Sequence, residues 1–79
     1  MLFRSGQIET LQFHIKEANK MTAKPLSHLK LKKGILIAAI IRKGKTIFPT
    51  GEDTLEVGDQ LLVTTLLPNI TKIYDLIER

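Results

Sequence analysis

The sequence predicts a small α+β domain with a mostly antiparallel sheet and two helices, in the order β-α-β-β-β-α. Three observations support this fold class. Residues 8–15 alternate between apolar and polar side chains, residues 35–41 form a continuous apolar run, and glycines separate the short segments of the second half. Seventy-nine residues suffice for one domain. We expect residues 8–79 to form it, after a disordered lead-in or cloning remnant at residues 1–7.

The first half of the chain is expected to hold one strand and one short helix. In residues 8–15 the apolar side chains occupy every second position from Leu11, which is typical of a half-buried strand. Pro25 presets a backbone angle suited to the first turn of a helix. Leu26 and Leu29 are three residues apart, so they would share one face of that helix.

The second half is expected to supply three more strands. The run Ile35–Ile41 is apolar at every position, which predicts a strand buried on both faces. A tight hairpin at residues 42–45, with Gly44 in the left-handed region, would lead into a short strand at residues 46–48. Residues 60–65 are expected to form the last strand.

The chain is expected to end in a second helix. Asn69 is the candidate N-cap, because its side chain can accept a hydrogen bond from an unpaired backbone N–H. Isoleucines at positions 70, 73 and 77 would line one face of this helix.

The composition argues against several classes of protein. The chain has no cysteine, so disulfides, thiol nucleophiles and thiolate metal sites are excluded, and a reducing compartment is expected. The longest apolar run, seven residues, is far shorter than the ~20 residues of a membrane-spanning helix, so we expect no direct membrane insertion. No nucleophile is paired with a positioned base, so we expect no catalytic residues and no enzyme. The core must consist mainly of Ile, Leu and Val, and a core that thin favours a homodimer.

Charge is unevenly distributed along the chain, which carries a formal net charge of +4. Half of the twelve bases lie in a stretch without an acid: Lys30, Lys32, Lys33, Arg42, Lys43 and Lys45. The next turns carry four acids without a base: Glu52, Asp53, Glu56 and Asp59. The basic stretch has no aromatic residue to stack on bases, so we expect a solvated rim and no nucleic-acid partner. The acids do not follow the spacing of a calcium loop, so we expect no metal site.

A set of short motifs lies between Lys24 and Val63, and the resemblance that they carry extends over nearly the whole chain, from about Glu9 to Arg79. In order they are Lys24-Pro25-Leu26-x-x-Leu29, Gly34-x-Leu36-Ile37-x-Ala39-Ile40-x-Arg42-x-Gly44, Ile47-x-Pro49, Thr54-Leu55-Glu56-x-Gly58-Asp59 and Leu61-Leu62-Val63. Together they resemble the TrkA C-terminal domain, also called the C-terminal subdomain of RCK proteins, of Trk-type potassium uptake regulatory proteins.

The resemblance implies a twofold dimer that follows a Rossmann-type domain in a parent protein. This chain has no Gly-x-Gly-x-x-Gly fingerprint, so NAD or ATP would bind only that upstream domain. The expected function is a cytoplasmic regulatory and dimerisation module of a potassium or other cation transport system. A small ligand would gate the membrane potassium-transport subunit, which would hold the protein at the inner face of the membrane. An anion or amino-acid transporter, or a proton antiporter, is an alternative host.

Some members of this family bind cyclic di-AMP across the dimer twofold, which gives an alternative function as a cyclic di-AMP sensor. The resemblance implies apolar contacts plus an arginine and an asparagine near the start of the central strand. The corresponding candidate ligand-binding residues here are Leu31, Lys32, Lys33, Ile35, Leu36, Ile37 and Pro49. A lysine stands in for the arginine and offers a point charge in place of a planar fork. Leu36 occupies the asparagine position and cannot donate a hydrogen bond.

Overall fold

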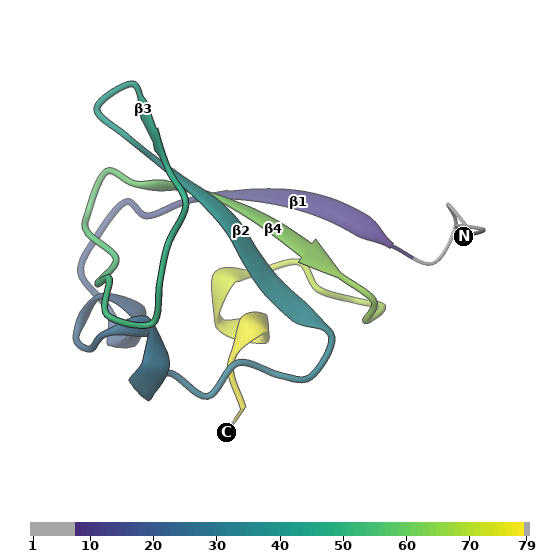
Figure 1. Cartoon of the computed structure of the whole chain (residues 1–79). Helices are drawn as coiled ribbons and strands as arrows, with labels where there is room; N and C mark the ends of the chain where they lie inside the picture. Colours follow the sequence, from purple (N-terminus) through teal and green to yellow (C-terminus); the bar gives the residue numbers. More distant parts are fainter. Residues whose placement is uncertain (1–7, 79) are drawn as a thin grey trace.

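The structure, a computed structural model, describes residues 8–78. The lead-in predicted at residues 1–7 lies outside this range. Four strands form one sheet: β1 (Glu9–His14), β2 (Ile35–Arg42), β3 (Lys45–Ile47) and β4 (Gln60–Thr65). Their order across the sheet is β1-β4-β2-β3, and every neighbouring pair is antiparallel (Figure 1). The four predicted strands and the antiparallel arrangement are therefore confirmed.

The predicted helices are wrong, because the structure has only short 3₁₀ turns in their place. These turns are η2 (Lys20–Thr22), η3 (Leu26–His28) and η4 (Ile73–Leu76). Near the chain end, Asn69 has a φ of 64°, the left-handed region, so it does not cap a helix. A β-bridge between Ile77 and Leu31 draws the chain out of the helical conformation after one turn. Pairing with distant residues overrides the local helical pattern here.

Backbone pairing also limits the first predicted helix. Pro25 has an extended ψ of 154° and forms an isolated β-bridge with Thr54. Leu29 is again extended, with a ψ of 133°. Only one 3₁₀ turn fits between these two extended residues.

Strand β2 is not buried on both faces as its composition predicts. Leu36 is 60% exposed, whereas Ile37 and Ile40 are buried. The register places Ile37 opposite Val63 and Ala39 opposite Leu62, so one extra residue is inserted between them as a β-bulge. The bulge turns both buried isoleucines toward one face, which explains how a continuous apolar run can still have an exposed side.

The hydrophobic core lies against a single face of the sheet. Its buried members come from strands, loops and turns: Ile15, Met21, Ile37, Ile40, Leu55, Leu61, Val63 and Leu76. The 3₁₀ turns contribute Met21 and Leu76 and cover the inner face of the sheet (Figure 1). The outer face of the sheet has no second layer within the described residues.

Candidate ligand and interaction sites

The candidate ligand-binding residues around the start of β2 point in different directions. Leu31 and Ile35 are half-buried and pack against the core, and Ile37 is 5% exposed. Leu36 lies on the outer face, because consecutive strand residues point to opposite faces. A ligand on the outer face can therefore reach Leu36 without touching Ile37.

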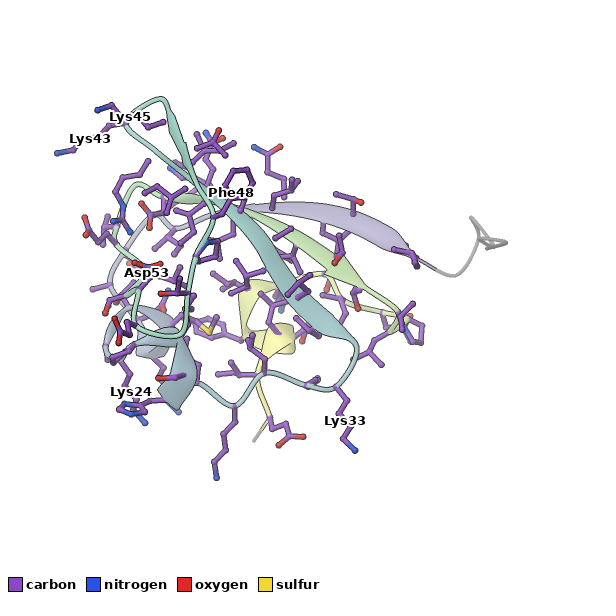
Figure 2. The ribbon with its side chains drawn as sticks, viewed as in Figure 1. Lys24, Lys33, Lys43, Lys45, Phe48 and Asp53 are labelled. Carbon is purple, nitrogen blue, oxygen red and sulfur yellow. The ribbon has the colours of Figure 1, made fainter. Side chains whose placement is uncertain are left out.

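The remaining candidates are also spread over the surface. The half-buried Lys32 lines a cavity on the core side of the sheet, and its backbone N–H donates to the carbonyl of Leu76 at 2.9 Å. Lys33 is exposed and projects from the turn before β2 (Figure 2). Pro49 follows β3 and is half-buried. One copy of the chain does not gather all seven residues into one pocket, so the predicted set stays a prediction.

An ion pair between a half-buried arginine and a buried aspartate joins the basic and acidic halves of the central region. The guanidinium of Arg42, at the end of β2, donates to both carboxylate oxygens of Asp59, with Nε–Oδ1 and Nη2–Oδ2 distances of 2.9 and 2.8 Å. Nη2 also donates to the carbonyl of Thr54 at 3.0 Å, and Nη1 lies 3.1 Å from Oε2 of Glu56. Asp59 is 1% exposed. We call these four residues the Arg42 clamp.

The Arg42 clamp favours the ionised form of its buried acid. The hydrogen bond from Arg42 lowers the pKa of Asp59, helped by a 2.9 Å hydrogen bond from the backbone N–H of Glu56, while burial acts in the opposite direction. The same hydrogen bond to Asp59 raises the pKa of Arg42. The sequence motifs contain both Arg42 and Asp59 but predict no contact between them. A contact between residues that are distant in the sequence leaves no regular spacing by which it could be recognised.

The four acids of residues 52–59 do not converge. Two of them belong to the Arg42 clamp, and Asp53 accepts a 2.7 Å hydrogen bond from the backbone N–H of Thr50. Within residues 8–78, no group of three or more metal-ligating side chains is placed to hold an ion.

The β2–β3 hairpin presents charge at its tip. Lys43 has a φ of 52° and Gly44 a φ of 76°, so both residues of the two-residue turn are left-handed, as in a type I′ hairpin. Only Gly44 was predicted to adopt this conformation. Lys43 and Lys45 project from the body of the molecule at this tip (Figure 2).

The outer face of the sheet carries an apolar area beside a polar one. Strand β1 presents exposed Thr10, Gln12 and His14, as expected of a solvated face. Strands β2 and β4 instead present Leu36, 60% exposed, with half-buried Ile41 and Leu62. Phe48, just after β3, is 78% exposed. We call these four apolar residues, Leu36, Ile41, Leu62 and Phe48, the outer apolar patch. Its composition is typical of an interaction surface.

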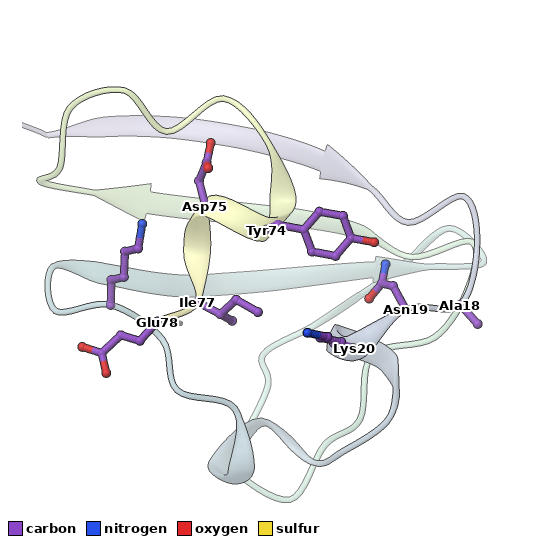
Figure 3. A pocket seen from close by; sticks show the side chains of 8 residues that line it. Ala18, Asn19, Lys20, Tyr74, Asp75, Ile77 and Glu78 are labelled. Carbon is purple, nitrogen blue, oxygen red and sulfur yellow. The ribbon is translucent and has the colours of Figure 1, made fainter.

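A cavity of about 730 Å³ opens on the other side of the molecule, between η2 and the end of the chain (Figure 3). We call it the C-terminal pocket. It is lined by Ala18, Asn19, Lys20, Lys32, Tyr74, Asp75, Ile77 and Glu78.

Backbone pairing holds the wall of the C-terminal pocket in place. The bridge between Leu31 and Ile77 is extended by a hydrogen bond from the N–H of Glu78 to the carbonyl of Lys30 at 2.6 Å. On the opposite wall, Oδ1 of Asn19 accepts from the N–H of Met21 at 2.7 Å. Among the lining residues, the sequence predicted only Lys32 as a ligand-binding candidate and assigned Ile77 to one face of the expected terminal helix.

The charges in the C-terminal pocket have both signs. Oδ2 of Asp75 accepts from the backbone N–H groups of Thr71 and Lys72, each at 3.0 Å, and these bonds lower the pKa of Asp75. The positive charge of Lys32 lowers it further. Over residues 8–78 the ion pairs of the structure all involve Arg42, so Lys20 and Glu78 face the pocket without an ionic partner from this range.

These features define a small antiparallel domain with an exposed apolar patch on one face of its sheet and a mixed-charge pocket on the other. The sequence profile of the TrkA-C domain matches residues 11–78, so the chain belongs to the TrkA-C domain family. The resemblance seen in the sequence motifs is thereby confirmed. TrkA-C domains are regulatory, generally non-catalytic and typically cytoplasmic. Within residues 8–78, no helix is long and apolar enough to cross a membrane.

Three curated relatives place this domain in cation transport proteins. The chain is 26% identical over 62 residues to Trk system potassium uptake protein TrkA homolog 2 of Methanosarcina mazei, and 29% identical over 58 residues to homolog 1. It is 32% identical over 62 residues to the K(+)/H(+) antiporter NhaP2 of Shewanella sp. strain ANA-3. These alignments cover 78%, 73% and 78% of this chain but only 14%, 13% and 11% of the respective relatives.

Proposed function

We propose that this chain is a regulatory and dimerisation module of a potassium or other cation transport system. The family match over residues 11–78 carries the proposal, supported by two potassium uptake proteins and a K(+)/H(+) antiporter among the relatives. Because the chain spans at most 14% of those relatives, it would act on a membrane subunit through a longer parent protein at the cytoplasmic face. NAD or ATP, in this proposal, belongs to an upstream Rossmann-type domain.

Transport measurements on the parent protein test the proposed role. Cells that lack their own potassium uptake systems would express the parent with its membrane subunit, with or without residues 8–79. We expect removal of the domain to leave rubidium uptake measurable but to abolish its response to regulatory conditions. Identical regulation in both strains would contradict the proposal.

The outer apolar patch supports a homodimer. Burying apolar area stabilises association by roughly 25 cal/mol per Å² removed from water. Two copies that face each other through this patch would cover Leu36 on β2 and Phe48 just after β3. Both are large apolar side chains that are mostly exposed in one copy. A second copy would also supply the layer that the outer face lacks.

Light scattering with a charge-insertion variant tests this dimer. We expect the unmodified chain to have the mass of a dimer at high micromolar concentration, and Leu36→Lys to have the mass of a monomer. Val57→Lys is the matched control, because Val57 is 55% exposed and lies on a loop beside the Arg42 clamp. A monomeric unmodified chain, or equal effects of both variants, would refute the proposed interface.

The second candidate function is a cyclic di-AMP sensor. It is favoured by the exposure of both Lys33 and Leu36 at the start of β2, where a cation adjoins an apolar surface. A ligand across the dimer twofold would meet each of them twice. Calorimetry with cyclic di-AMP decides: we expect heat on mixing and a rise in melting temperature, and the absence of both removes this candidate.

A further inference from the structure

The C-terminal pocket presents opposite charges on either side of an apolar centre. Figure 3 shows Lys20 and Glu78 on opposite sides of Ile77, with the ring of Tyr74 above Lys20. Both charged side chains are exposed, so they are accessible to a ligand that enters the pocket. Tyr74 is 51% exposed and offers an aromatic surface beside them.

The other two charges of the pocket, Lys32 and Asp75, have opposite signs and together carry no net charge. Lys32 is close enough to lower the pKa of Asp75, whose Oδ2 also accepts hydrogen bonds from two backbone N–H groups. Lys20 and Glu78 are therefore the charged residues of the pocket lining that remain to pair with a ligand. A simple anion would be attracted by the first and repelled by the second, and a simple cation would meet the reverse.

We propose that the C-terminal pocket binds a zwitterionic metabolite of dipeptide size, whose two charges lie at opposite ends of the molecule. Its carboxylate pairs with Lys20, its ammonium group pairs with Glu78, and its apolar part lies along Ile77 and Tyr74. The volume of about 730 Å³ is within the range of roughly 300–1,000 Å³ typical of small-molecule sites. The ligand gives the proposed regulatory module a signal to sense, so the physiological meaning of the site rests on that proposed function.

Ligand binding would act on the contact that holds the chain end. The segment that carries Tyr74, Ile77 and Glu78 is tied to the segment before β2 through the Leu31–Ile77 bridge and the hydrogen bond from Glu78 to Lys30. A ligand that bridges this segment to Lys20 would link it to η2 as well. We therefore expect binding to slow the amide exchange of residues 76–78.

Nuclear magnetic resonance on the 79-residue chain tests the site. The probe is the dipeptide leucyl-leucine, compared with N-acetyl-leucyl-leucine, which lacks the ammonium group, and leucyl-leucine amide, which lacks the carboxylate. We expect the zwitterion to shift the amide signals of residues 19–21 and 74–78. Each single-charge analogue should bind about two- to fivefold more weakly, because one exposed ion contact contributes at most about 1 kcal/mol.

Charge-neutralising variants supply the controls. Lys20→Gln and Glu78→Gln should each weaken binding of the zwitterion about two- to fivefold. Lys43→Gln and Glu52→Gln change exposed charges that do not line the pocket, and they should leave binding unchanged. The inference is overturned if the signals of residues 19–21 and 74–78 do not move. It is also overturned if a single-charge analogue binds as tightly as the zwitterion, or if the control variants weaken binding equally. Dimer mass and rubidium uptake are independent of these readouts, so failure here is distinguishable from failure of the proposed function.

Discussion

The Arg42 clamp makes the stability of the whole domain depend on one guanidinium. In Arg42→Met the side chain keeps its apolar stem, but the carboxylate of Asp59 loses two hydrogen bonds and its counter-charge. Because Asp59 is 1% exposed, only water that enters the space left by the guanidinium can replace the lost hydrogen bonds, and water does not replace the counter-charge.

The magnitude follows from burial at each end of the pair. Removing one partner of a buried ion pair costs about 3–5 kcal/mol. The Arg42 side chain is 26% exposed, so the lower end of this range, about 3 kcal/mol, applies. The contact with Glu56, which is 59% exposed, adds at most about 1 kcal/mol. A domain of this length has roughly 4–12 kcal/mol in total, so the variant should lose a large share of its stability.

Chemical and thermal unfolding, followed by circular dichroism, measure this loss. A change of about 3 kcal/mol should lower the melting temperature by about 12–24 °C. Lys45→Met in the same hairpin is the control, because Lys45 is exposed and belongs to no ion pair among the described residues; it should change stability by less than about 0.5 kcal/mol.

A double variant separates the buried charge from general damage to the hairpin. Arg42→Met combined with Asp59→Asn leaves no uncompensated charge, and the side-chain amide oxygen that Asp59→Asn introduces can still accept from the N–H of Glu56. We expect the double variant to be more stable than Arg42→Met alone. If Arg42→Met loses less than about 1 kcal/mol, or if the double variant is less stable than the single one, the assigned role of the clamp is refuted.

Three further predictions concern acid, the hairpin turn and the chain end. The folded-state pKa of Asp59 is depressed below its ordinary 3.8, so its contribution is present above that value and is lost as the pH falls through the folded pKa. Denaturant melts from neutral pH to about pH 3 should show this loss, and Asp59→Asn should make the curve flatter. Gly44→Ala should destabilise by about 1–2 kcal/mol in the same melts, through backbone strain alone, because φ is 76° and no atom lies within 4 Å of the added Cβ; an unchanged midpoint would exclude that strain. Asp75→Ala should speed the amide exchange of Thr71 and Lys72, which donate to its carboxylate, while leaving exchange in β4 unchanged.

Sequence patterns predicted the sheet well because its strands follow local patterns, an apolar–polar alternation in β1 and a continuous apolar run in β2. The period of two that starts at Leu11 matches the observed burial of β1, and the glycines mark turns that the structure contains. The bulge in β2 could not be predicted. A bulge shows in a sequence as a one-residue shift in the alternation of apolar and polar residues, and residues 35–41 are apolar at every position. The family motifs also identified the domain family before any contact was known.

The candidate sites were less predictable, since each one depends on residues that are distant in the sequence. Lys32 was named from the resemblance alone, and its partners in the C-terminal pocket come from η2 and the chain end. The outer apolar patch exists because β2 and β4 are neighbours in the sheet. Neither neighbourhood follows from spacing along the chain.

The sequence by itself determined the strands, their turns and the family, because these depend on short-range alternation, on glycine and on contiguous motifs. The tertiary structure decided the conformation of the chain end and the pairing of Arg42 with Asp59. Residues 69–77 carry a helical pattern, yet pairing of Ile77 with Leu31 allows only one 3₁₀ turn and opens the C-terminal pocket beside it. From the sequence alone, Arg42 and Asp59 are expected to be solvated charges. In the fold the carboxylate of Asp59 is buried, and a buried charge requires a partner, which Arg42 supplies.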